Sequence, residues 1–95
     1  MEQVALADNL ATDTRKLLPK IAKCESDLDP TAVHYNKNNT EDYSVLQINS
    51  VHIPQMKKFG LDYYNWRDSV IYGIYLASST GLRPWKSSEW CWDKK

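Results

Sequence analysis

Residues 18–50 read LPKIAKCESDLDPTAVHYNKNNTEDYSVLQINS, an apolar helical pattern that ends in an acid and continues as a polar segment rich in turn residues. The acid is Glu25. Four apolar residues precede it at helical spacing: Leu17, Leu18, Ile21 and Ala22. An anion at a helix C-terminus opposes the helix dipole, and apolar neighbours also disfavour the charged form, so both effects raise the carboxyl pKa. A general acid needs a raised pKa near neutral pH, although a solvated acid closing an ordinary helix is the simpler interpretation of an isolated glutamate.

A second carboxylate, Asp42, follows on the far side of a polar turn. Residues 36–40 have the composition of a hairpin turn, and residues 43–48 have the composition of a strand. A hairpin that folds back against the helix end would bring Asp42 opposite Glu25 across a cleft. Two carboxyls in unlike surroundings, one apolar and one hydrated, are the pattern of an acid paired with a charge stabiliser in glycosidic cleavage.

The remaining helices are predicted from periodicity and from their end signals. Residues 2–11 indicate a short amphipathic helix. The next helix runs to about Glu25, and it either begins near Lys16 or Leu17, so that Pro19 lies in its first turn, or is kinked at Pro19; we favour the first. Residues 27–35 are expected to form a loop above two packed side chains, Ala32 and Val33.

Two further helices follow the hairpin. The first covers residues 53–59 and ends at Gly60, and the second covers residues 66–79, with Asn65 as N-cap and Gly81 as its stop. Gly73 is expected to let a neighbouring element pack closely, at a cost of about 1 kcal/mol relative to alanine. The predicted core face of this second helix comprises Val70, Ile71, Ile74 and Ala77.

Length and cysteine content predict one small domain. The chain has 95 residues, of which 42% are hydrophobic, so its core is thin. Cys24 and Cys91 are its only cysteines. A disulfide between them would close nearly the whole chain and would stabilise it by about 4 kcal/mol through loop entropy. Two buried thiols are the alternative, and no other cysteine or close histidine spacing completes a zinc site.

Charge and hydropathy exclude several classes of protein. The net charge is zero and there is no basic stripe, which speaks against a nucleic-acid partner. No apolar run is long enough to span a membrane. The start, MEQVALADNL, lacks the features of a signal peptide. If the cysteines are bridged, either the precursor carries an export signal that is absent here or the chain leaves the cell by another route.

Three motifs resemble those of a known family. They are Glu25-Ser26-x-x-x-Pro-x-Ala, then Asp42-Tyr-x-x-Leu-Gln-Ile-Asn-Ser, and a later Gly-x-x-Pro-Trp. Together they are similar to the lysozyme superfamily, which includes soluble-lytic-type lytic transglycosylases and c-type lysozymes, over about residues 14–92. The Glu-to-Asp interval is similar to that of the c-type enzymes. Residues 47–60, QINSVHIPQMKKFG, more closely resemble the small transglycosylases that accompany bacterial secretion and conjugation machines.

The resemblance implies a mainly α, reduced lysozyme-like domain with a small β-hairpin that lines the active-site groove. It implies a lytic transglycosylase that cuts the β-1,4 bond between N-acetylmuramic acid and N-acetylglucosamine, with Glu25 as general acid and base and without a cofactor. One alternative is a lysozyme-type hydrolase that also uses Asp42. A catalytically silent wall-binding module is the other, motivated by the small size and by Ser44, which stands where the family usually has glycine.

Roles for other residues follow from the same resemblance. Ser26 and Ser44 are expected to be structural, and Ser44 to affect the hairpin geometry or the fit of a sugar ring over it. At least one tryptophan is expected to stack on sugar, with four core tryptophans as the alternative. Gln47 and Asn49 could instead stabilise the turn and hairpin, and for Asn49 this role is as strongly favoured as sugar binding. The expected substrate-binding residues are Tyr43, Gln47, Asn49 and Trp85.

We expect the chain to come from a bacterium or a phage and to act on the bacterial cell wall. We expect a monomer that acts on peptidoglycan glycan strands in the periplasm or outside the cell. The resemblance further implies association with a secretion-system or envelope machine.

Overall fold

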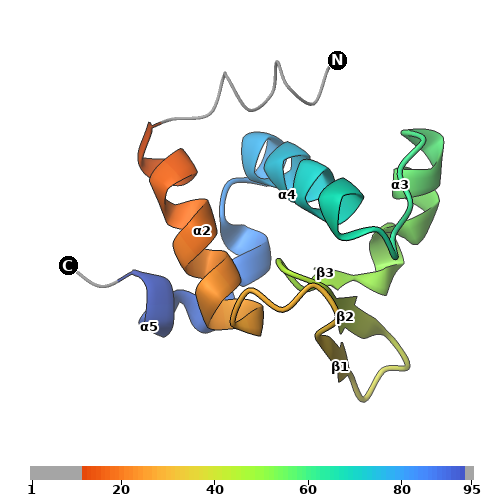
Figure 1. Ribbon diagram of the computed structural model, residues 1–95, viewed down its shortest axis with the longest axis horizontal. Coiled ribbons are helices and arrows are strands. Elements are labelled where there is room, and N and C mark those ends of the chain that lie inside the picture. Colours follow the sequence, from red (N-terminus) through yellow and green to blue (C-terminus); the bar gives the residue numbers. More distant parts are fainter. Residues whose placement is uncertain (1–11, 94–95) are drawn as a thin grey trace.

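The structure, a computed structural model, describes residues 12–93, with side chains from Lys16 onward. The helix predicted over residues 2–11 lies outside the described residues. Helices make up most of the described chain, and one small sheet lies beside them, as Figure 1 shows. The predicted mainly α fold with a small β element is confirmed. In chain order the elements are α2 (Thr12–Ser26), β1 (Val33–Tyr35), β2 (Glu41–Tyr43), β3 (Ile48–Asn49), η1 (Ser50–His52), α3 (Ile53–Lys58), α4 (Trp66–Thr80), η2 (Arg83–Ser88) and α5 (Glu89–Trp92).

The predicted start of α2 is wrong, although its predicted end is confirmed to within one residue. The helix already includes Thr12, so Pro19 lies in its interior rather than in its first turn. An interior proline costs about 3 kcal/mol because it removes a backbone hydrogen bond and crowds the preceding turn. The helix tolerates it because Ile21 is 0% exposed and Ala22 is 4% exposed, and tertiary packing supplies most helix stability. Two further apolar residues of α2 pack partly buried against the same core: Leu17 and Leu18.

The sheet has three antiparallel strands in the order β1-β2-β3 rather than a single hairpin. Strand β1 pairs Val33 with Tyr43, so the end of the predicted loop is a strand, and Val33 is 42% exposed instead of packed. Residues 44–47, predicted as strand, form a tight turn. Ser44 and Gln47 adopt φ values of 73° and 52°, and this left-handed backbone reverses the chain from β2 into β3. Strand composition was misleading here because two apolar side chains of the turn point into the core region: Val45 and Leu46.

Helix α4 is the central helix, and its end signals are confirmed. The Asn65 side chain accepts hydrogen bonds from the backbone N–H groups of Arg67 and Asp68 at 2.9 and 3.2 Å. Gly81 at its end has a φ of 72°, and Gly60, which follows α3, has a φ of 75°. Both values lie in the left-handed region that favours glycine, so these helices stop where their sequence signals predict.

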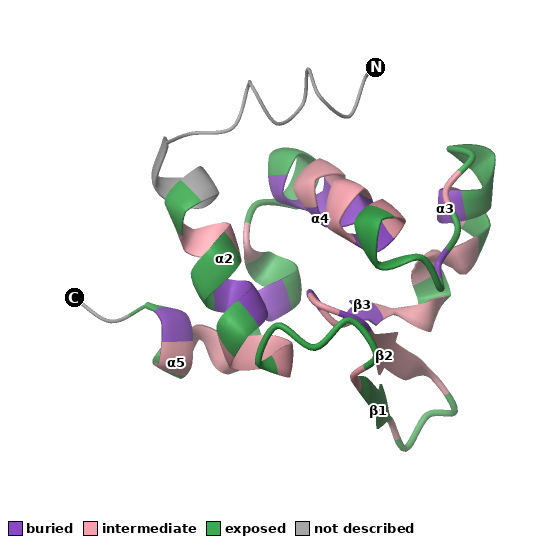
Figure 2. Cartoon of the chain, viewed as in Figure 1, coloured by how far each residue is buried: buried purple, intermediate pink, exposed green. Residues whose placement is uncertain are grey.

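The predicted core face of α4 is wrong except for Ala77. Val70, Ile71 and Ile74 are only half-buried. Gly73 lies at the centre of the buried face, because its missing side chain makes room for Leu46 of the 44–47 turn. The expected close approach at Gly73 is therefore confirmed. The buried stretches of α4 are purple in Figure 2. The buried residues of α4 are Ser69, Tyr72, Gly73, Leu76 and Ala77.

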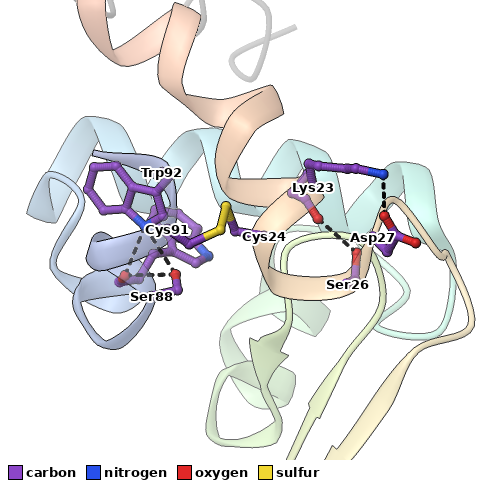
Figure 3. The surroundings of a disulfide bond; sticks show 9 residues. Lys23, Cys24, Ser26, Asp27, Ser88, Cys91 and Trp92 are labelled. Carbon is purple, nitrogen blue, oxygen red and sulfur yellow. Dashed lines mark hydrogen bonds and ion pairs between the residues drawn. A yellow bond between two sulfur atoms is a disulfide. The ribbon is translucent and has the colours of Figure 1, made fainter. Parts of the chain in front are cut away.

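A disulfide joins the C-terminal part of α2 to the last described helix, α5. Cys24 of α2 bonds to Cys91 of α5, with their Cα atoms 6.0 Å apart, so the predicted pairing is confirmed (Figure 3). Helix α5 also buries Trp92, which is 5% exposed. Of the helices in residues 12–93, none is long and apolar enough to cross a membrane.

Candidate active site

Glu25 is the next-to-last residue of α2, and its side chain is half-buried. Burial raises the pKa of the Glu25 carboxyl, since a partly desolvated carboxylate loses hydration. The Ser88 side chain favours the charged form and lowers this pKa, whereas the negative charge of Asp42 raises it. The net pKa is above the ordinary value of 4.5. The direction is the one predicted from the sequence, and burial is its first cause.

Asp42 lies in the middle of β2, on the side of the sheet where two amide groups can reach it. Asn49 of β3 donates through Nδ2 to Asp42 Oδ1 at 2.9 Å, and Asn36 donates through Nδ2 to Oδ2 at 3.3 Å. The two carboxyls therefore have unlike surroundings, because Glu25 is desolvated whereas Asp42 is supplied with donors. The sequence motifs did not single out Asn36, whose only signal was its place in the polar turn.

Ser26 ties the end of α2 to the turn that follows β2. Its Oγ lies 2.7 Å from the carbonyl oxygen of Val45 and 3.1 Å from that of Ala22. The first contact joins segments that are far apart in the sequence. It holds the helix end, and with it Glu25, at a fixed place relative to the turn that leads out of β2.

The amide side chains expected to bind sugar are engaged within the protein. Gln47 donates through Nε2 to the carbonyl oxygens of Ser44 and Ala32, at 2.8 and 3.1 Å. Asn49 donates to Asp42, as described above, and its side-chain oxygen accepts from the backbone N–H of Val51 at 2.9 Å. Both amides hold the turn and the sheet together. This is the alternative role that the sequence left open for them.

The expected aromatic contacts are also placed differently. Trp85 is 2% exposed and donates through Nε1 to the carbonyl oxygen of Leu46 at 2.8 Å, so it is a core residue and its predicted stacking on sugar is wrong. Tyr43 neighbours Asp42 on one strand, so their side chains point to opposite faces of the sheet. The Tyr43 ring packs against Tyr63 and Tyr64, with centroids 5.7 and 5.3 Å apart.

Ser44 occupies the position where the sequence departs from the family pattern. It is fully buried, its φ is 73°, and its hydroxyl oxygen has no hydrogen-bond partner within the described protein. A non-glycine residue held in this region costs about 1–3 kcal/mol. The turn nevertheless forms, because the Ser44 backbone N–H donates to the Ala32 carbonyl oxygen at 2.7 Å and its carbonyl accepts from Gln47.

Among the hollows on the described surface are two open ones that Glu25 does not line. One, of about 470 Å³, borders the disulfide, and the other, of about 300 Å³, lies at the β1–β2 turn. The groove expected beside the hairpin stays a prediction. In residues 12–93 no group of three or more His, Cys, Asp and Glu side chains is placed to hold a metal ion.

Comparisons with known proteins find partial relatives. No family model matches the chain. Three curated proteins named Invasion protein IagB, from two strains of Salmonella typhimurium and from Salmonella typhi, are each 34% identical to it over 55 residues. The match covers 58% of this chain and 34% of each relative, so the chain spans about a third of the length of the relatives it matches. The similarity is to part of each relative, and it assigns no activity to this chain.

Proposed function

We propose that the chain cleaves the β-1,4 glycosidic bond between N-acetylmuramic acid and N-acetylglucosamine in peptidoglycan, with Glu25 as the general acid. The supporting observation is that two carboxyls have unlike surroundings. The Glu25 carboxyl is partly desolvated and its pKa is raised, whereas the Asp42 carboxylate accepts hydrogen bonds from two side-chain amides. An acid that keeps its proton beside an anion suits a reaction in which a leaving oxygen is protonated while positive charge develops on a sugar.

In this proposal the reaction is that of a lytic transglycosylase. Glu25 gives its proton to the bridging oxygen as the bond to the anomeric carbon breaks. The C6 hydroxyl of the muramic acid then attacks that carbon, and the Glu25 carboxylate takes the hydroxyl proton. The product is an anhydro sugar, no water is consumed, and Glu25 is protonated again. The resemblance of residues 47–60 to the small transglycosylases favours this route.

A lysozyme-type hydrolase is the second candidate, and the state of Asp42 favours it. Its carboxylate accepts a hydrogen bond on each oxygen, which fixes the orientation that a nucleophile or an electrostatic stabiliser needs. In this route Asp42 would attack the anomeric carbon as a nucleophile or stabilise the positive charge on it. A water molecule activated by Glu25 would then complete hydrolysis. The two candidates share their first step and differ in the group that attacks.

The products distinguish the candidates. Purified peptidoglycan is digested with the protein in H₂¹⁸O, and the muropeptides are then analysed by mass spectrometry. Anhydro ends without ¹⁸O support the transglycosylase, whereas reducing ends that carry ¹⁸O support the hydrolase. Peptidoglycan that is bound but left uncut would contradict both enzymes and would favour a wall-binding module.

The role of Glu25 is tested by Glu25→Gln, which keeps the shape of the side chain but has no proton to give. We expect turnover to fall by about 10²- to 10⁴-fold, because general acid catalysis contributes that much. Sedimentation with peptidoglycan should show unchanged binding. Glu41→Gln, in β2, is the matched control and should keep the parent rate. Full turnover in Glu25→Gln would remove Glu25 from the mechanism.

We also propose that the chain works on the cell wall, in the periplasm or outside the cell. The disulfide supports this location, because disulfides persist in oxidising compartments and are rare in the cytosol. A secretion or envelope machine would then be the partner that brings the chain to its substrate.

A further inference from the structure

The two amide side chains that hold Asp42 share a further partner, the hydroxyl of Thr40. Each amide carries two hydrogens on its nitrogen, and Asn36 and Asn49 each donate one of them to Asp42. Each amide donates its other hydrogen to Thr40 Oγ1, which lies 3.2 Å from Asn36 Nδ2 and 3.2 Å from Asn49 Nδ2. One hydroxyl oxygen therefore contacts both of the groups that orient the Asp42 carboxylate.

The Thr40 hydroxyl uses its full hydrogen-bonding capacity. Its proton is donated to Asn38 Oδ1, which lies 2.6 Å from Thr40 Oγ1. A hydroxyl has one proton and can accept two hydrogen bonds, so both acceptor positions remain for the two amides. The same Asn38 oxygen accepts from the Thr40 backbone N–H at 3.2 Å, which holds the Asn38 side chain within the turn. The proton therefore points to Asn38, and the oxygen presents its lone pairs to the amides.

The backbone places Thr40 where it can serve this purpose. Thr40 ends the turn that joins β1 to β2 and is half-buried (Figure 1). Its carbonyl oxygen accepts from the backbone N–H of Asn36 at 2.9 Å, so these two residues face each other across the turn. Because both amides reach Thr40 and Asp42 together, the Thr40 and Asp42 side chains lie on one face of the sheet.

The two amides depend on Thr40 to different degrees. The side-chain oxygen of Asn49 accepts from the backbone N–H of Val51 at 2.9 Å, which fixes the orientation of this amide independently of Thr40. Among the residues that the structure describes, the Asn36 side chain bonds only to Thr40 and Asp42. Loss of the Thr40 hydroxyl would therefore leave Asn36 with one side-chain partner, whereas Asn49 would keep two.

We propose that Thr40 is a positioning residue for Asp42, which it orients through the two amides and chiefly through Asn36. This inference rests on the proposed function, in which the Asp42 carboxylate faces a sugar that develops positive charge. A carboxylate held at both oxygens is already oriented when that charge appears, so no reorganisation is needed during the reaction. The Thr40 proton stays on its oxygen throughout.

The first test follows the side-chain NH₂ groups of Asn36 and Asn49 by ¹⁵N relaxation. Thr40→Val keeps the shape of the side chain and removes the hydroxyl. The order parameter of the Asn36 amide should fall to that of a flexible group, below about 0.6, whereas the Asn49 amide should keep its parent value because Val51 still holds it. Thr40→Ser retains the hydroxyl and should leave both amides as ordered as in the parent.

The matched control is Thr31→Val, in the loop before β1. The Thr31 hydroxyl donates to Asp29 at 2.7 Å, outside this network, so its removal should leave both amides unchanged. If Thr40→Val does not fold, Thr40→Ala removes the same hydroxyl with less bulk and gives the same comparison. An Asn36 amide that stays as ordered as in the parent would overturn the proposal. Equal loosening of both amides would also overturn it, because a general loosening of the sheet has that effect.

The second test measures peptidoglycan cleavage. Thr40→Val should lower the rate by about 10- to 100-fold, since misplacing a reacting group by about 1 Å can cost about 100-fold. Sedimentation should show unchanged binding to peptidoglycan, and Thr40→Ser and Thr31→Val should both keep the parent rate. If the parent cuts no peptidoglycan, the proposed function fails, and the relaxation data still decide whether Thr40 orients Asn36. An active parent whose rate is unchanged in Thr40→Val overturns the role of Thr40 alone.

Discussion

Ser44 is the residue at which sequence and conformation disagree most. Its left-handed φ of 73° suits glycine, and its buried hydroxyl has no partner within the described protein. Both features oppose folding, each by about 1–3 kcal/mol. The turn is kept because it delivers Leu46 to the core, where that side chain is 3% exposed.

We predict that Ser44→Gly stabilises the chain by about 1 kcal/mol or more, because the relief of both features exceeds the extra entropy of glycine in the unfolded chain, about 0.5–1 kcal/mol. Ser44→Ala removes the hydroxyl but keeps the unfavourable φ, so its stability should lie between those of the parent and Ser44→Gly. Urea unfolding monitored by tryptophan fluorescence gives the order. A parent more stable than both variants would mean that the hydroxyl makes a favourable buried contact.

At the scale of elements, the contact between α4 and the 44–47 turn decides how the core is built. A Cβ atom at Gly73 would overlap Leu46 Cδ1 and would also touch Ile48 Cδ1 at 3.8 Å. The absence of a side chain at Gly73 therefore lets the Leu46 side chain of the turn pack directly against the α4 backbone. Because the turn also accepts the Ser26 and Trp85 hydrogen bonds, it connects α4 with both α2 and η2.

We predict that Gly73→Ala destabilises the chain by about 1–2 kcal/mol. Overpacking costs about 1–3 kcal/mol, and the better helix propensity of alanine returns about 1 kcal/mol. Leu46→Ala alone should cost about 2–5 kcal/mol. The double variant should be more stable than the sum of the single losses implies, since the smaller side chain at 46 makes room for the methyl group.

The control for this cycle is Ser78→Ala, at an exposed position of the same helix. It should change the free energy of unfolding by no more than about 0.5 kcal/mol. Strict additivity of Gly73→Ala and Leu46→Ala would show that the two side chains do not compete for the same space.

At the scale of the whole molecule, the disulfide compensates for a thin core. It closes a loop with a sequence separation of 67 residues, which includes every strand and most of the helices described. The loop-entropy relation assigns such a closure about 4 kcal/mol, a large share of the stability of a small domain.

We predict that Cys24→Ser with Cys91→Ser lowers the free energy of unfolding by about 2–4 kcal/mol, because the unfolded chain gains the freedom that the bond removes. Urea unfolding of the parent with and without dithiothreitol should show the same loss. The double variant is the control and should not respond to the reductant. A parent whose bond is shown by mass spectrometry to be reduced, yet whose stability is unchanged, would contradict this account.

Local sequence patterns were sufficient wherever a feature depends on residues close in the chain. The N-cap at Asn65 and the glycines at 60 and 81 act on their own backbone neighbours, so the ends of α3 and α4 could be predicted. The disulfide was predictable because the chain has only two cysteines. Glu25 was identified because an acid at the end of an apolar helix is unusual in its immediate context.

Packing between distant segments settled what these patterns left open. The buried face of α4 is set by Leu46 entering at Gly73, a contact that no periodicity in the helix encodes. Trp85 became a core residue because its indole N–H bonds to the turn beneath it. The pKa of Glu25 likewise depends on burial and on Ser88 and Asp42, which reach it from η2 and β2. Desolvation and charge act through space, so the acidity of this carboxyl is a property of the folded chain rather than of its helix.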